Sequence, residues 1–199
     1  MKNWLEQKNI ILDNVFTDSQ IIAIKKIVAS KKPDLFEPQH GRYLIGLDNM
    51  LSEDIKDRLL SLAKECTGED LILSNLGYSL YSPEYGTPEL KPHIDGNDTE
   101  FVIDYQLSSN VDWDVYVEGE RYSLKDNQAI TFAGSDQIHW RPIKKFNSGD
   151  RLEMIYFHMI TKDHWSLTGG ENPKISSEWR QKQNESFDKY KNDWLKTEE

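Results

Sequence analysis

The sequence contains a single cysteine among its 199 residues, and no apolar run approaches membrane-spanning length. One thiol, Cys66, excludes an internal disulfide framework. The absence of a long apolar run excludes a transmembrane helix, and the N-terminus also lacks the apolar segment of a signal peptide. We therefore expect a cytoplasmic protein with no membrane partner.

Basic residues are also scarce: 24 Lys and Arg stand against 34 Asp and Glu, for a formal net charge of -10. This balance argues against an extended phosphate-binding surface, so nucleic acid is not an expected partner. The length supports one domain with a sizeable core. We expect a single domain over 1–199, with an N-terminal strand and supporting helices (1–70), a strand-rich core (71–160) and a C-terminal extension with a helix (161–199).

The central part of the chain consists of short strand patterns separated by turn residues. The turn at 118–120 joins two of them as a hairpin. Several strands at this spacing, with no helical pattern between them, predict an antiparallel sandwich or jelly roll. The expected strands are 101–107, 113–117, 121–124, 129–132, a short strand at His139, and 151–160.

Two amphipathic helices are expected before this core, after a strand at 9–16. Thr17 and Gln20 have the spacing of a capping box, and Ser52, followed by two acidic residues, begins the second helix. Both helices should pack on the sheet. Between them, residues 39–46 fit a connecting strand better than a loop over the mouth of the core. The apolar positions are Ile21, Ile24 and Val28 in the first helix, and Ile55, Leu59 and Leu62 in the second.

The C-terminal segment 177–199 is highly charged, but it places Phe187, Tyr190 and Trp194 on one face of a helix. Docking of this face onto the domain is the simpler interpretation. A contact between two copies of the chain is the alternative, which would make the protein an oligomer.

Two histidines and one aspartate carry the clearest chemical signal. His93 and Asp95 are two residues apart in a strand-like segment, so their side chains project to the same face while Ile94 points away. His139 follows in another strand. Two imidazoles and one carboxylate on one side of a divalent metal leave the other side open, as in non-haem Fe(II) oxygenases.

A His-x-Asp pattern alone is weak, because it also fits a hydrogen-bonded pair at the rim of a sheet. The surrounding residues strengthen the metal interpretation. Proline and glycine interrupt the chain at 83–92, and another turn follows at 96–98. The pair therefore lies at the end of a short strand, where side chains can meet a ligand.

At this point the chain resembles a known family, the Fe(II)- and 2-oxoglutarate-dependent dioxygenases, in particular the bacterial and phage branch related to prolyl hydroxylases. The resemblance depends on the His93-x-Asp95 pair, the distal His139 and a basic residue, Arg151, that opens the next strand. It covers about 10–160 and is strongest over 78–158.

The resemblance implies an α+β, mainly β fold: a double-stranded β-helix, which is a jelly-roll, cupin-like core, with N-terminal helices packed on the sheet and a C-terminal helix. It also implies that His93, Asp95 and His139 bind Fe(II). O2 and 2-oxoglutarate would be consumed, with ascorbate in a supporting role. The implied reaction is hydroxylation of a small molecule or a peptidyl side chain, with release of succinate and CO2.

The far carboxylate of 2-oxoglutarate requires a cation, and a guanidinium can bind it with two parallel hydrogen bonds. The resemblance favours Arg151 for this role. Arg141 is the main competitor, and a surface charge at a strand edge is the plain alternative for Arg151. Either Tyr81 or Tyr85 is a candidate for the tyrosine that often helps to hold the cosubstrate in this family.

Loops around the mouth set substrate selectivity in such folds. Candidate lining residues are Trp113, Arg121, Trp140 and Arg141. His158 is expected to be a core histidine with one hydrogen bond, and His164 lies in a polar segment, so neither is expected to bind metal.

Two other functions remain open: a cupin-like metalloprotein with non-oxidative activity, and a catalytically silent binding module. A cation placed for a distal carboxylate favours the dioxygenase over the first alternative. The complete His-Asp-His set argues against the second.

Overall fold

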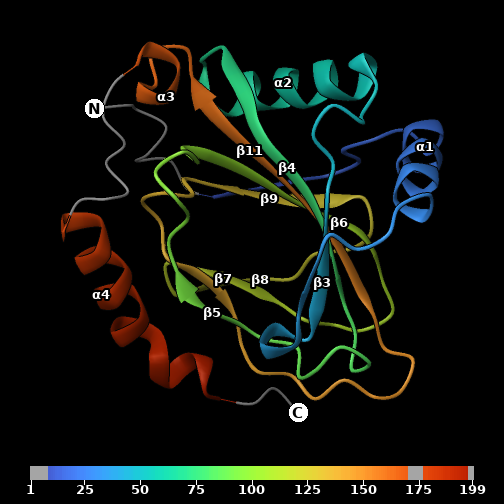
Figure 1. The fold of residues 1–199 in the computed structure, drawn as a ribbon, viewed down its shortest axis with the longest axis vertical. Coiled ribbons are helices and arrows are strands. Elements are labelled where there is room, and N and C mark those ends of the chain that lie inside the picture. Colours follow the sequence, from blue (N-terminus) through green and yellow to red (C-terminus); the bar gives the residue numbers. More distant parts are fainter. Residues whose placement is uncertain (1–8, 170–176, 197–199) are drawn as a thin grey trace.

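The structure is a computed structural model that describes residues 9–169 and 177–196. It is mostly β, with two antiparallel sheets that face each other (Figure 1). The larger sheet has the order β1 (Ile10–Leu12), β9 (Gln128–Phe132), β6 (Phe101–Ser109), β11 (Leu152–Thr161), β4 (Leu71–Tyr81), β3 (Arg42–Gly46) and β2 (Leu35–Glu37). The smaller sheet has the order β5 (Leu90–His93), β10 (His139–Arg141), β7 (Val115–Val117) and β8 (Glu120–Tyr122). The predicted antiparallel, mainly β architecture is confirmed.

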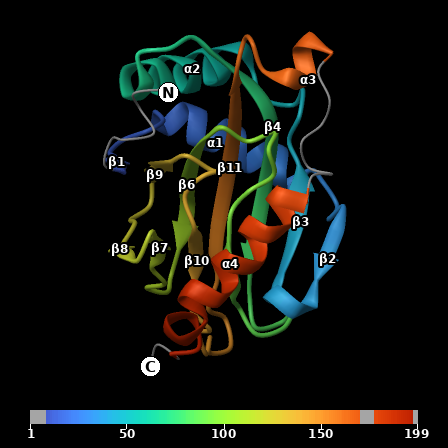
Figure 2. The ribbon, with the colours of Figure 1, turned by 90° about the vertical axis from the view of Figure 1, so that its left-hand side faces the viewer.

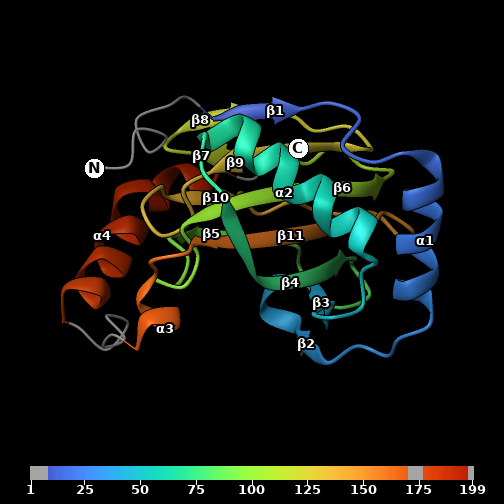
Figure 3. The same cartoon turned by 90° about the horizontal axis from the view of Figure 1, so that it is seen from above.

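The two predicted N-terminal helices are α1 (Asp18–Ala29) and α2 (Glu53–Thr67). The capping box at the start of α1 is present: the Thr17 hydroxyl accepts from the Gln20 backbone N–H, and the Gln20 side chain accepts from the Thr17 N–H. The buried faces of both helices belong to one apolar core with the larger sheet (Figure 3). The packing of both helices on the sheet is therefore confirmed.

Alternation along β11 separates this apolar core from the space between the sheets. Ile155, Phe157 and Met159 point into the helix-covered core, where each buried side chain contributes roughly 1.5–3 kcal/mol. Met154, Tyr156 and His158 instead line a cavity between the two sheets. Between residues 154 and 159 of this strand, odd-numbered side chains therefore face the helix-covered core, and even-numbered side chains face the cavity.

The strand predicted at 9–16 is shorter than expected. Asn14 has a positive φ of 50°, so the chain leaves the sheet after β1. Beyond β1, the Asn127 side chain takes the place of a neighbouring strand: it accepts a hydrogen bond from the Phe16 N–H and donates one to the Phe16 carbonyl.

The other connections follow the sequence patterns. A short 3-10 helix, η2 (Pro38–His40), precedes β3, which is the connecting strand expected there. The β7–β8 hairpin turns through Glu118 and Gly119, both with positive φ. The remaining short helix, α3 (Trp165–Thr168), follows β11.

The C-terminal helix α4 (Ser177–Trp194) crosses the smaller sheet (Figure 2). Tyr190 stacks on Trp140 with 4.3 Å between ring centroids, Tyr116 also stacks on Trp140, and Trp194 is buried. Docking onto the domain is confirmed, and the contact between two copies stays a prediction. Within the described residues, no helix is both long and apolar enough to cross a membrane.

Candidate metal centre and its cavity

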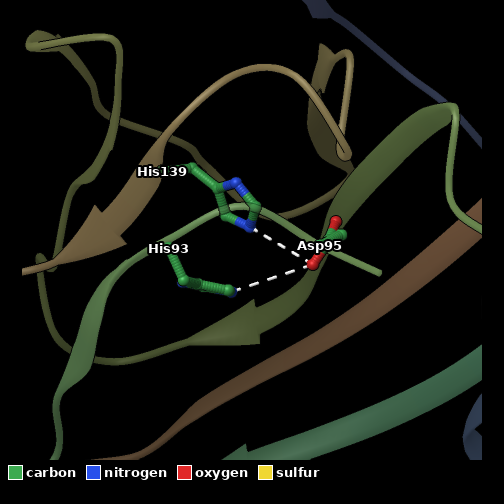
Figure 4. Close-up of side chains that lie close together, drawn as sticks. All are labelled: His93, Asp95 and His139. Carbon is green, nitrogen blue, oxygen red and sulfur yellow. Dashed lines mark ion pairs between the residues drawn. The ribbon is translucent and has the colours of Figure 1, made fainter. Parts of the chain in front are cut away.

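His93, Asp95 and His139 come together at adjacent ends of two paired strands. His93 ends β5, Asp95 follows two residues later, and His139 begins β10 directly opposite His93 in the antiparallel ladder. One nitrogen or oxygen from each residue lies within 4.8 Å of the others. Figure 4 shows both rings directed at the same carboxylate oxygen. The structure therefore brings together the three residues that the sequence suggested as metal ligands.

Backbone carbonyls fix how the two imidazoles face this centre. His93 Nδ1 lies 2.7 Å from the Lys91 carbonyl oxygen, and His139 Nδ1 lies 3.1 Å from that of Gln137. A carbonyl can only accept, so both Nδ1 atoms carry the proton. The two Nε2 atoms then face Asp95 Oδ1, at 3.8 and 3.6 Å, which is the orientation that metal-bound histidines have.

The charges at the centre also suit a metal. Burial, together with the nearby His139, lowers the pKa of His93 to about 4, so its ring is neutral. Burial opposes ionisation of Asp95, but His139, His158 and His93 hold its pKa well below the ordinary value. Burial likewise opposes the charging of His139, but Asp95 raises the pKa of this imidazole above its ordinary value. Two imidazoles and an ionised carboxylate fit Fe(II) or a similar divalent ion.

A cavity of about 200 Å³ lies between the sheets beside this centre. Both sheets contribute to its wall, and the wall combines cations, acids and apolar side chains. The lining residues are Arg42, Leu44, Asn75, Ser79, Tyr81, Leu90, His93, Asp95, Val102, Asp104, Phe132, His139, Arg141, Met154, Tyr156 and His158.

Arg141 is the more deeply buried of the two arginines that line the cavity, with 2% of its surface exposed. It lies two residues after His139 on β10 and therefore faces the same side, whereas Trp140 between them faces α4. Its guanidinium donates to the Trp113 carbonyl and lies 3.7 Å from Asp104 Oδ2. Burial raises the pKa of Asp104 above its ordinary value, despite the nearby Arg141.

Arg42 and Tyr81 form a second polar group on the wall. Arg42 Nη1 donates to the Tyr81 hydroxyl at 2.7 Å, and Arg42 Nε donates to Glu37 Oε2 at 2.6 Å. Tyr81 was a predicted cosubstrate residue and does line the cavity. Arg42 was not among the predicted site residues. It lies in the segment 39–46, where aromatic and basic residues stand beside glycines, and this composition was the one sequence feature that could have indicated a site residue there.

The prediction for Arg151 requires correction. Its side chain is 54% exposed, forms an ion pair with Glu153 and is not among the cavity-lining residues. Arg151 and Glu153 lie on the face of β11 opposite to Met154 and Tyr156, which do line the cavity. The arginine at the start of the strand therefore points away from the candidate metal centre.

Three of the predicted substrate residues are also placed away from the cavity. Trp113 is buried beside Arg141 and donates to the Pro142 carbonyl. Arg121 is on β8, largely exposed and paired with Asp114. Trp140 is covered by α4, so Arg141 is the one member of this group that faces the cavity.

The two remaining histidines differ from each other. His158, expected in the core, lines the cavity and lies 3.9 Å from Asp95 Oδ2. Its Nδ1 lies 3.1 Å from the Thr99 hydroxyl oxygen. His164 is buried, and its side chain caps the start of α3 by accepting from the Ser166 N–H. This structural role accounts for a histidine at this position without any metal-binding role.

Gly134 has no side chain and so leaves room for the Asp95 carboxylate. Gly134→Ala should displace that carboxylate and weaken Mn(II) binding by at least about 10-fold, because small displacements of a metal ligand have effects of this size. A Cβ at Gly134 would lie 2.5 Å from Asp95 Oδ2, closer than side-chain atoms approach. Calorimetric titration would measure the change. Gly46→Ala is the matched control, because its Cβ would meet Asp34 Oδ2 at an ordinary 3.6 Å. Equal affinity in both variants would contradict this account.

No protein-family model matches the chain, and no curated protein matches it either. Solved structures do match. An oxidoreductase of the 2OG-Fe(II) oxygenase family from Burkholderia pseudomallei aligns with a TM-score of 0.61 at 14% identity, over 85% of this chain and 91% of that chain.

Two further matches contain bound ligands. HygX from Streptomyces hygroscopicus, with nickel and 2-oxoglutarate bound, gives a TM-score of 0.58 at 11% identity, over 78% of this chain and 83% of that one. A prolyl hydroxylase from Trichoplax adhaerens, in complex with a peptide fragment of hypoxia inducible factor, gives 0.58 at 13% identity, over 83% and 90%. The chain therefore has the fold of the 2OG-Fe(II) oxygenases.

Proposed function

We propose that the protein is an Fe(II)- and 2-oxoglutarate-dependent dioxygenase with a double-stranded β-helix core. The proposed reaction is hydroxylation of a small molecule or a peptidyl side chain, with release of succinate and CO2. One observation carries the proposal: His93, Asp95 and His139 direct their donor atoms at one point, beside a cavity that contains the buried cation Arg141.

His93, Asp95 and His139 would hold the iron. Bound iron supplies oxygen activation coupled to the oxidative decarboxylation of 2-oxoglutarate. The protein prepares the ligands in advance, because the Lys91 and Gln137 carbonyls orient both rings. The ligands occupy one side of the centre, which leaves the cavity side for the cosubstrate.

Arg141 would bind the far carboxylate of 2-oxoglutarate. The side chain is fixed by the Trp113 carbonyl and shielded from water, and a guanidinium matches a carboxylate with two parallel bonds. Tyr81 and Arg42 lie on the same wall and form the alternative anchor. HygX, which shares the fold, binds 2-oxoglutarate together with a metal.

The size of the cavity supports a substrate that enters only in part. Cavities that enclose drug-sized ligands measure roughly 300–1,000 Å³, whereas this one measures about 200 Å³. With 2-oxoglutarate inside, the remaining space suits one side chain or a small part of a molecule. A peptide is the ligand of the Trichoplax prolyl hydroxylase, which has the same fold.

Succinate formation under air with Fe(II), ascorbate and 2-oxoglutarate tests the proposal. Wild-type protein should form succinate, pools of small molecules or peptides should increase the rate, and His139→Ala should reduce it to background, because one of three ligands is lost. The control omits Fe(II). Protein that binds Mn(II) but forms no succinate with any pool, and does not bind 2-oxoglutarate, would instead be a metalloprotein of the non-oxidative, cupin-like kind.

A further inference from the structure

The two oxygens of the Asp95 carboxylate have different surroundings. Oδ1 faces the Nε2 atoms of His93 and His139 at 3.8 and 3.6 Å, which is the metal side. Oδ2 faces away from that point, toward His158 Nε2 at 3.9 Å. His158 does not belong to the group whose donor atoms converge within 4.8 Å, so it contacts a ligand without being one.

A narrow slot surrounds Oδ2. A Cβ at Gly134 would lie 2.5 Å from this oxygen and 2.7 Å from the methyl groups of Thr99 and Val102. The Asp95 N–H donates to the Gly134 carbonyl at 2.8 Å, which fixes the backbone on both sides of the slot. The absence of a side chain at position 134 therefore gives Asp95 Oδ2 its space beside Thr99 and Val102.

One ring nitrogen of His158, Nδ1, faces the Thr99 hydroxyl, which can donate to it or accept from it. An Nε2 lone pair facing an ionised carboxylate would be repulsive, so Nε2 carries the proton and points it toward Oδ2. Nδ1 is then an acceptor, and the Thr99 hydroxyl, 3.1 Å away, donates to it. Thr99 is itself buried, and its N–H donates to the Gly96 carbonyl.

We propose that His158 is a positioning residue for the metal centre: its Nε2–H lies 3.9 Å from Asp95 Oδ2 and attracts that oxygen electrostatically, away from the ion, so that Asp95 binds through Oδ1 alone. This inference rests on the metal site of the proposed function. Binding through one oxygen leaves one more coordination position for the cosubstrate and oxygen than binding through both. The Thr99–His158–Asp95 chain links β11 to the loop after β5.

Measurements of metal binding, which do not depend on catalytic turnover, test this role of His158. Mn(II) affinity should fall by about 10- to 100-fold in His158→Leu, the range found when a partner of a metal ligand is removed. His158→Gln places an amide N–H near the Nε2 position and should restore most of the affinity. Co(II) bound to His158→Leu should show altered visible absorption bands, because binding through both oxygens changes the coordination number.

Thr99 provides a second test that keeps the imidazole in place. Thr99→Val removes the hydroxyl at nearly constant volume and should weaken Mn(II) binding in the same direction, whereas Thr99→Ser should not. His40→Leu is the control for loss of an imidazole outside the cavity-lining residues.

The outcomes separate this inference from the proposed function. Wild-type protein that binds neither Mn(II) nor Co(II) would overturn both. Normal metal binding in wild type, His158→Leu and Thr99→Val would overturn the positioning role and leave the triad intact. Equal losses in His158→Leu and His158→Gln would show that the N–H donor is not what matters, which also overturns the inference.

Discussion

Arg141→Lys is expected to raise the 2-oxoglutarate concentration needed for half-maximal succinate formation by about 100-fold. A hydrogen bond to a charged group contributes about 1.5–3 kcal/mol, and a loss of about 3 kcal/mol corresponds to about 100-fold in affinity. Lysine retains the charge but cannot form two parallel bonds with a carboxylate. The measurement is the rate of succinate formation as a function of 2-oxoglutarate concentration.

Arg151→Lys is the matched control, because it makes the same chemical change at a position just before β11 whose side chain points away from the cavity. It should leave the 2-oxoglutarate requirement unchanged, since Arg151 is exposed and pairs with Glu153. Mn(II) affinity should be normal in both variants if the metal ligands are undisturbed. An unchanged requirement in Arg141→Lys, with a large increase in Arg42→Lys, would transfer the anchor to the Arg42–Tyr81 pair.

Arg141 lines the cavity and Arg151 does not, and the sequence alone could not distinguish the two. Spacing along the chain suggested Arg151, but the loop from Pro142 to Asp150 and the pairing irregularity after Glu153 decide which side chains of β11 face the cavity. Both faces of β11 are largely apolar at 154–160, so no alternation of polar and apolar residues indicated the inner face. In such a strand, a one-residue error in the predicted register assigns every side chain to the wrong face of the sheet.

Features set by neighbouring residues were predictable. The capping box at Thr17, the helix begun at Ser52 and the aromatic face of α4 depend on spacings of three or four residues. The pairing of His93 with Asp95 depends on a spacing of two. Each pattern lies within one element, where local geometry determines which side chains share a face.

The missed cavity residues depend on strand pairing over long distances. Arg42 reaches the cavity because β3 pairs with β4 so that Arg42 lies opposite Tyr81. His158 approaches Asp95 because β11 lies between β4 and β6 at the centre of the larger sheet. Neither register could be inferred from the sequence, because it results from the packing of the whole sheet.

Asp95→Ala is expected to weaken Mn(II) binding by more than about 100-fold, beyond the 10- to 100-fold loss typical of a residue that only supports a ligand. It should also reduce 2-oxoglutarate decarboxylation to background. The carboxylate is the one anion of the ligand set, and His93, His139 and His158 all face it. Without it, the metal meets only neutral imidazoles. Calorimetry with Mn(II) and the succinate assay measure the two effects.

Two further variants separate the charge of Asp95 from its shape. Asp95→Asn keeps the size of the side chain and removes the charge, so it should lose affinity almost as Asp95→Ala does. Asp57→Ala removes an exposed carboxylate on α2 and should bind Mn(II) normally. Formate added to Asp95→Ala can occupy the space that the side chain leaves, and partial recovery of Mn(II) binding would identify the carboxylate oxygen as the missing donor. Full affinity in Asp95→Ala without formate would remove Asp95 from the ligand set, and with it the argument that connects the His93–His139 pair to oxygen chemistry.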